Sequence, residues 1–264
     1  MMSDIWKSLS RLKLKILPCI LWACVPVYAT SIVVLRSADG TVVVVAADSQ
    51  FTPEKGSPLT GCKIAQIEKQ YWIAIAEISA DPERRFSPYQ IAIDAAAHNK
   101  NNLDAIVTEF QRKSTALLPA VIRHRRKFLG KHVFDQRYEG KPAMQAVFLG
   151  KENGVLRVVA IDFIVRTRKG RGVEIAPKRN KCPGNCAVKA PLKVFLVSHE
   201  VIDAFSPSKQ DTADLDSLAR KLVQEEIDND RACNCAMPID VLHIDSLGTH
   251  WVGPLGPLCH EVQQ

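Results

Sequence analysis

Residues Thr30–Ser49 read TSIVVLRSADGTVVVVAADS, two runs of β-branched residues separated by Asp39-Gly40. Valine and isoleucine favour extended backbone, and an Asp-Gly pair between such runs is a strong hairpin signal. We therefore expect strands at 31–37 and 41–47 that pair with each other. Because nearly every position in both runs is apolar, this hairpin should lie inside the protein.

The rest of the chain alternates short strands with a few helices. Ser87-Pro88 predicts a helix start, because serine caps helix N-termini and proline suits the first turn. A second helix, expected at 102–128, should bend or break at Pro119. This order predicts an α+β fold with two sheets and helices outside them. The further expected elements are strands at 63–68, 71–77, 143–149, 155–164, 193–197, 238–245 and 249–252, and helices at 88–98, 102–128 and 212–229.

The first 29 residues have the pattern of a secretory signal peptide. A basic front precedes the apolar run Ile16–Ala29, which at about 14 residues is shorter than the roughly 20 that span a bilayer. Val27-Tyr28-Ala29 predicts cleavage before Thr30. We expect residues 1–29 to be removed and residues 30–264 to form one exported domain, periplasmic or secreted, with no stable membrane span.

Cleavage there would make a threonine the first residue. Its α-amino group, with a pKa of roughly 7.7–8.0, can take the proton of its own hydroxyl, which makes Thr30 a self-activated nucleophile. Leu21-Trp22-Ala23-Cys24 offers an alternative, since it loosely matches a lipoprotein cleavage box. Cutting before Cys24 would leave Thr30 inside the chain and remove this chemistry.

Several motifs together resemble the proteasome β-subunit and its bacterial relatives among the N-terminal-nucleophile (Ntn) hydrolases. They are Thr30-Ser31-Ile32-Val33-Val34, Asp39-Gly40, Ala46-Ala47-Asp48-Ser49, Lys63-Ile64 and Pro238-Ile239-Asp240-Val241. The resemblance covers most of the chain from Thr30 to about Val252 and is strongest up to Ala80. It implies the four-layer α-β-β-α sandwich of that family.

The resemblance also implies a set of catalytic residues. Thr30 is the nucleophile and, through its amine, the base. Lys63 lies near its hydroxyl, and Asp48 pairs with that lysine. Ser198 and Asp230 correspond to the groups that orient the terminal amine, and Asp228 competes with Asp230 for this role.

Glu77 departs from the family pattern. The family has glycine at this position, where the backbone N–H stabilises the oxyanion of the tetrahedral intermediate. Glutamate keeps the N–H, but its carboxylate would oppose a developing negative charge, and a positive φ would be costly without glycine.

Cysteine and histidine spacing bears on covalent links and metals. Six of the eight cysteines follow the signal, and an even number in an exported chain favours disulfides. A four-thiolate zinc site is the alternative for the pairs Cys182/Cys186 and Cys233/Cys235. The seven histidines show no metal-ligand spacing, and we expect neither a metal nor another cofactor. The six cysteines are Cys62, Cys182, Cys186, Cys233, Cys235 and Cys259.

The charge of the chain is mildly basic. Residues 1–29 hold four basic residues and one acidic residue, so removing them lowers the net charge from +7 to +4. Basic residues concentrate at 112–131 and 166–181, which we interpret as a solvated helix end and a solvated hairpin loop. Neither segment interleaves aromatic residues with charge, so no nucleic-acid partner is expected.

Two functions follow from these patterns. The first is an exported N-terminal-threonine hydrolase that cleaves peptide or small amide substrates through an acyl-threonine intermediate. The second is a non-catalytic sandwich that serves as an interaction or assembly module, which Glu77 favours. Family members often assemble into rings, so the resemblance allows a homo-oligomer.

Overall fold

The hairpin expected from Thr30–Ser49 is the centre of the first of two five-stranded antiparallel sheets. In the computed structural model, β1 (Ile32–Arg36) pairs with β2 (Val43–Asp48), and the sheet order is β10-β1-β2-β11-β12. The other strands of this sheet are β10 (Leu192–Leu196), β11 (Ile239–Ile244) and β12 (Thr249–Trp251). The structure describes residues 30–51, 59–81, 83, 85–168, 172–189, 191–196, 214–229 and 237–253.

The second sheet follows the order of the sequence, β5-β6-β7-β8-β9. Its strands are β5 (Ile64–Glu68), β6 (Tyr71–Glu77), β7 (Pro142–Glu152), β8 (Val155–Arg168) and β9 (Gly172–Cys182). A separate two-stranded ribbon joins β3 (Gln50–Phe51) to β4 (Leu59–Thr60). The chain is therefore a mixed α+β protein.

Four α-helices lie in the described parts of the chain: α1 (Pro88–His98), α2 (Leu103–Leu129), α3 (Lys131–Tyr138) and α5 (Leu215–Asn229). As expected, the side chain of Ser87 caps α1, accepting a hydrogen bond from the backbone N–H of Gln90 at 3.4 Å. Of the two outcomes expected at Pro119, a break is wrong, because α2 runs through this proline to Leu129 and ends at Gly130. Leu118, Val121 and Ile122 are fully buried, and their packing outweighs the loss of one helical hydrogen bond.

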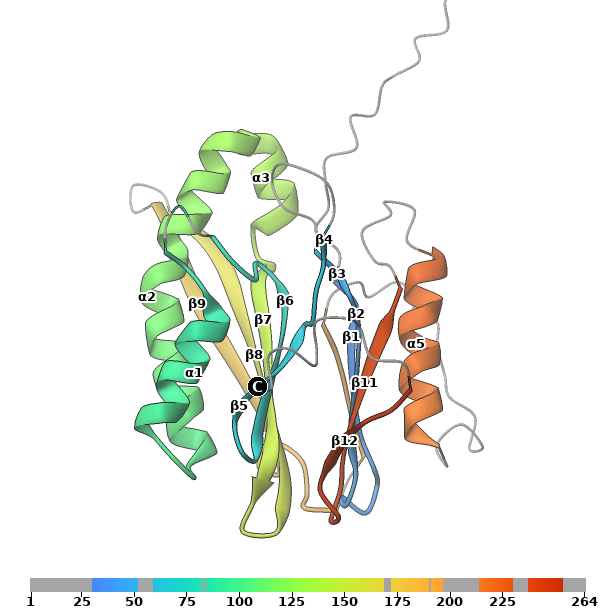
Figure 1. Ribbon diagram of the computed structural model, residues 1–264. Helices are drawn as coiled ribbons and strands as arrows, with labels where there is room; N and C mark the ends of the chain where they lie inside the picture. The colour runs from blue at the N-terminus through green and yellow to red at the C-terminus, as the bar shows by residue number, and fades with distance from the viewer. Residues whose placement is uncertain are drawn as a thin grey trace, which may run out of the picture.

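Three apolar clusters show how these elements pack (Figure 1). The first cluster joins α1, α2 and α3 to one face of the second sheet, and includes Phe110 and Phe148. The second fills the space between the two sheets, where Ile32 and Val34 meet Trp72. The third joins α5 to the outer face of the first sheet.

The sequence pattern predicts a solvated hairpin loop at 166–181. This is wrong at residues 172–181, which belong to strand β9. Val173 and Ile175 are buried while Glu174 between them is exposed, which is the alternation of a sheet with one solvated face. Numerous charged residues hide this pattern. They are common on edge strands, where they discourage pairing with other chains.

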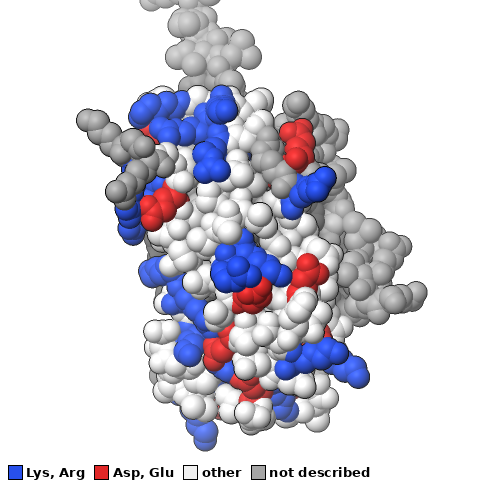
Figure 2. Space-filling model, turned by 90° about the vertical axis from the view of Figure 1, so that its left-hand side faces the viewer, with Lys and Arg blue, Asp and Glu red and all other residues white. Residues whose placement is uncertain are grey.

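The charged surface of the helical side is mixed. Figure 2 shows basic side chains interspersed with acidic ones over most of this face, with more basic groups towards the end where α3 lies. Exposed residues of that end include Arg123, Lys127 and Lys131. Among the residues described, no helix combines the length and apolar character needed to cross a bilayer.

Candidate active site

A fully buried ion pair connects the two sheets at one end of the molecule. The Nζ of Lys63 lies 2.8 Å from Oδ1 of Asp48, and both side chains are 0% exposed. Asp48 ends β2 in the first sheet, whereas Lys63 immediately precedes β5 in the second. The backbone carbonyl of Lys63 accepts hydrogen bonds from Ile75 N–H at 3.3 Å and Tyr89 Oη at 2.9 Å, which fix the position of the lysine.

The carboxylate of Asp48 also binds the backbone beside Thr30. Its Oδ1 accepts the N–H of Ser31 at 2.7 Å, and its Oδ2 accepts the N–H of Gln50 at 3.1 Å. Burial raises the pKa of Asp48, while the charge of Lys63 and these hydrogen bonds oppose the rise. Thr30 itself is buried, at 7% exposed. Three residues implied by the resemblance, Thr30, Asp48 and Lys63, therefore lie together.

Glu77 ends β6 in a strained conformation. Its φ is 68°, in the left-handed region, which costs a non-glycine residue about 1–2 kcal/mol. Its side chain is half-buried. Burial raises the pKa of Glu77 to about 7, and the positive charges of Arg137, Arg125 and Lys63 oppose this rise. Glu77 thus has a backbone conformation that suits glycine, and its carboxyl group lies near Lys63.

The two arginines near Glu77 were not among the expected site residues. Arg125 is 6% exposed, so the interpretation of 112–131 as a wholly solvated helix end is wrong at this position. Its Nη1 donates to the hydroxyl of Tyr138 at 3.0 Å. Leu118, Ile122 and Arg125 follow helical spacing, and this register could have placed Arg125 on the buried face of α2. The sequence held no comparable signal for Arg137, which comes from α3.

The structure does not bring the other expected site residues to this pair, since two of them are not described. Ser198 and Asp230 are outside the described residues, as are the signal segment 1–29, with its alternative cleavage at Cys24, and Cys233, Cys235 and Cys259. Asp228, the alternative to Asp230, is exposed on α5 and accepts a hydrogen bond from the amide of Gln224 at 2.8 Å. It behaves as a solvated helix-end residue.

The described cysteines form disulfides. Cys182 and Cys186 are joined, so the alternative that used both as zinc thiolates is wrong. Cys62 is also disulfide-bonded. In the described parts of the chain, no group of three or more histidine, cysteine or acidic side chains is arranged to hold a metal ion.

A cavity of about 430 Å³ lies at the opposite end of the sheets from Thr30. It is lined by Trp72 at the start of β6, Ile244 at the end of β11 and Trp251 of β12. Asp48 pairs with Ile239, at the other end of β11. Of the candidate catalytic residues that the structure describes, Thr30, Asp48, Lys63 and Glu77, none lines this cavity, so it is separate from the Asp48–Lys63 pair.

A scan against models of protein families finds no match to the chain, and a search of curated proteins finds no relative.

Proposed function

We propose that residues 30–264 form an exported Ntn hydrolase with the four-layer α-β-β-α sandwich and that Thr30 is its nucleophile. Support for the sandwich comes from the three apolar clusters, which order the elements as helices, sheet, sheet and helix. The observation that carries the function is the buried Asp48–Lys63 pair, whose carboxylate binds the N–H of Ser31 beside Thr30. A buried ion pair adds little to stability, so the presence of this pair supports a chemical role.

The proposed reaction begins with scission of the Ala29–Thr30 bond during export. The freed α-amine takes the proton of the Thr30 hydroxyl as Oγ bonds to the carbonyl carbon of a peptide or small amide. When the tetrahedral intermediate collapses, the C–N bond breaks and the leaving nitrogen takes that proton. Water then attacks the acyl ester, releases the acid and restores the hydroxyl.

Lys63 and Asp48 have distinct roles in this proposal. A positive charge near the Thr30 hydroxyl stabilises its deprotonated form and so lowers the cost of removing the proton. Asp48 holds the ammonium group of Lys63 in place and, through the N–H of Ser31, fixes the start of β1 relative to it. Ser198 and Asp230 remain proposed as groups that orient the α-amine.

The backbone N–H of Glu77 is the proposed oxyanion donor. A φ of 68° at a glutamate is unusual, and it suits an N–H that must point at a fixed position. The pKa of Glu77, at about 7, allows a substantial neutral fraction near neutral pH. In that form the side chain adds no negative charge beside the oxyanion.

A labelling experiment on the exported protein tests this function. Intact mass should first show that the product begins at Thr30. A β-lactone probe should then acylate the wild type at Thr30, located by peptide mapping, and label Thr30→Ala not at all. Thr30→Ser should keep labelling, because serine retains both hydroxyl and amine. A product that begins elsewhere, or a correctly processed and folded wild type that stays unlabelled, would contradict the proposal.

The second candidate is a non-catalytic interaction or assembly module. The specific observation in its favour is Glu77, which brings a carboxyl group to a position where catalysis needs none. Absence of labelling in processed, folded protein is the result this alternative predicts.

A further inference from the structure

A second buried polar pair lies beside the Asp48–Lys63 pair. The hydroxyl of Ser49 donates a hydrogen bond to Oδ2 of Asp240 at 2.9 Å, and each residue is 1% exposed. Burial of a carboxylate is costly, so such a group is expected to be hydrogen-bonded, as it is here. The bond joins the end of β2 to β11. The mechanism proposed above uses neither residue.

Strand register brings Ser49 opposite Thr30. Ile32 pairs with Ala47, and the N–H of Asp48 donates to the carbonyl of Ser31 at 3.0 Å. Continuing this register sets Thr30 against Ser49. Cβ atoms of opposite residues on one face of an antiparallel pair are about 4.5–5.5 Å apart.

Side-chain alternation puts both residues and Asp240 on the same face of the first sheet. Ile32 and Ala47 belong to the cluster between the two sheets. Thr30 and Ser49 are two residues from them and therefore share that face. Asp240 is paired with Ala47, and Leu242, two residues further along β11 and so on the same face, also belongs to that cluster. The three polar side chains thus converge at the end of the inter-sheet space.

We propose that Ser49 and Asp240 are positioning residues for the nucleophile, an inference that rests on the proposed function. Because Ser49 gives its proton to Asp240, its oxygen is left as an acceptor for an N–H of the Thr30 α-amine, and it holds that amine beside the Thr30 hydroxyl whose proton the amine takes. The carboxylate of Asp240 stabilises the protonated form of the nearby α-amine.

The backbone makes this arrangement rigid. The carbonyl of Ser49 accepts the N–H of Gly61 at 2.8 Å, two residues before Lys63. Ser49 is therefore bonded to β11 through its side chain, and through its backbone to Gly61 in the segment that leads to Lys63. A group held on both sides can position its neighbour precisely enough for catalysis.

The test measures the rate of Thr30 acylation by a β-lactone probe against pH in exported, processed protein. Ser49→Ala and Asp240→Asn should each slow acylation about tenfold or more, since a small misplacement of a reacting group is costly. Ser49→Thr, which keeps the hydroxyl, should retain most of the rate. Removing the negative charge in Asp240→Asn lowers the pKa of the Thr30 α-amine. The acid limb of the profile, where the acylation rate rises with pH, should therefore move about 0.5–1 unit to lower pH.

Ser114→Ala is the matched control for loss of a buried hydroxyl. Ser114 lies on α2, is 0% exposed, and its hydroxyl has no hydrogen-bond partner among the described residues. The Ser114→Ala protein should be acylated at Thr30 at the wild-type rate and with the wild-type pH profile.

Four results would overturn the inference. Ser49→Ala and Asp240→Asn could acylate at the wild-type rate with an unmoved acid limb. Asp240→Asn could slow the reaction without moving the limb, or fail to fold by circular dichroism, and either result would make the bond purely structural. If the wild type itself is not labelled at Thr30, the proposed function fails and this inference fails with it.

Discussion

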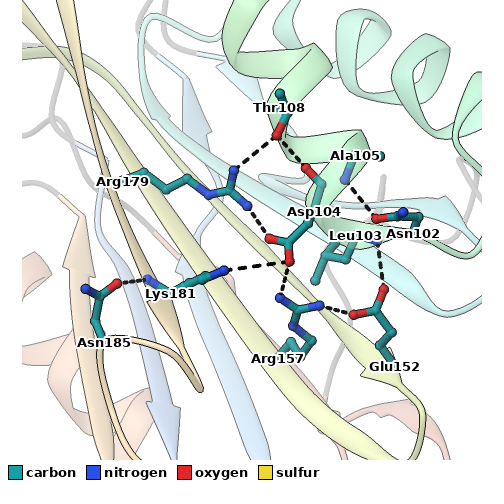
Figure 3. Close-up of polar contacts among 10 residues, drawn as sticks. All are labelled: Asn102, Leu103, Asp104, Ala105, Thr108, Glu152, Arg157, Arg179, Lys181 and Asn185. Carbon is teal, nitrogen blue, oxygen red and sulfur yellow. Dashed lines mark hydrogen bonds and ion pairs between the residues drawn. The ribbon is translucent and has the colours of Figure 1, made fainter.

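Two ion-pair clusters in this protein have opposite surroundings. The Asp48–Lys63 pair is 0% exposed on both sides and joins the two sheets. The second cluster centres on Asp104 of α2, which Arg157 of β8 contacts at 2.6 Å and Lys181 of β9 at 3.8 Å, with Arg179 also bound (Figure 3). The side chain of Asp104 is 39% exposed.

The pKa values of the two aspartates move in opposite directions. Burial raises the pKa of Asp48 despite Lys63. At Asp104 burial also raises the pKa, but the hydrogen bond and charge of Arg157, with Lys181 and Arg179, outweigh it and lower the pKa. The Asp104 cluster therefore stabilises the fold as a charged network. The buried pair costs stability as a charged group, which is why we propose a chemical role for it.

Removing one partner of the buried pair should give the largest effect. Lys63→Met leaves the Asp48 carboxylate buried without its cation, which should lower the free energy of unfolding by about 3–5 kcal/mol at neutral pH. Because Asp48 can take up a proton instead, the loss should shrink in acid. Urea unfolding at pH 5 and pH 8 measures both effects, and Thr30 acylation should be lost.

A double variant separates the effect of an unpaired buried charge from the effect of the lost lysine side chain. Asp48→Asn with Lys63→Met removes both charges and keeps an acceptor for the N–H of Ser31. It should recover most of the stability lost in Lys63→Met while remaining inactive. If Lys63→Met alone stays within about 1 kcal/mol of the wild type, the contrast between the two clusters is wrong.

Glu77 should make stability depend on pH. Its pKa is about 7 in the folded protein, against roughly 4.3 in an unfolded chain. The folded state therefore holds the proton of Glu77 more tightly. The contribution of Glu77 to the free energy of unfolding is greatest below about pH 4 and declines as pH rises to about 7. Glu77→Gln cannot titrate and should lack this decline. Because Glu77 is only half-buried, we expect a gain of about 2 kcal/mol over the wild type at pH 8 and little at pH 4.

Glu77→Gly distinguishes charge from backbone strain. Glycine removes the carboxyl group and also relieves the positive φ, which should add about 1 kcal/mol of stability at every pH. Thermal unfolding of both variants between pH 4 and pH 8 gives the comparison. A wild type whose stability does not fall across this range would show that Glu77 ionises as freely in the folded protein as in the unfolded chain.

The sequence predicted local elements well, because their signals are local. The hairpin of β1 and β2 follows from β-branched runs around Asp39-Gly40, and the start of α1 follows from Ser87-Pro88. Pairing of Asp48 with Lys63 came only with the family resemblance, since nothing local links residues 15 apart across two sheets.

Long-range contacts explain what the sequence did not predict. Arg125 is charged, yet it is buried because Tyr138 and Glu77 lie near it in the folded chain. The Asp104 cluster joins residues 53 and 75 positions apart, so its cations look like solvated surface charges in the sequence. The bond between Ser49 and Asp240 spans 191 residues and has no sequence signal of its own.

Asp104→Asn should have the smallest effect of these changes. It keeps the shape of the side chain but removes the charge among Arg157, Arg179 and Lys181, and we expect a loss of about 1 kcal/mol at pH 7. Exposed charges are screened by salt, so 1 M NaCl should reduce the difference from the wild type. Asp228→Asn is the control, because Asp228 is exposed and accepts from the neutral amide of Gln224. It should leave stability unchanged.

Acid distinguishes the Asp104 cluster from the buried pair. A lowered pKa means that the stabilisation from Asp104 is fully present above the ordinary aspartate value of about 3.9 and is lost as pH falls below it. The wild type and Asp104→Asn should therefore converge in stability as pH falls through the lowered pKa of Asp104. Lys63→Met should begin to approach the wild type at a higher pH, because the pKa of Asp48 is raised and its carboxylate takes up a proton earlier. A loss in Asp104→Asn that is insensitive to salt and acid would mean that the contact acts through packing, and the two clusters would then differ in burial alone.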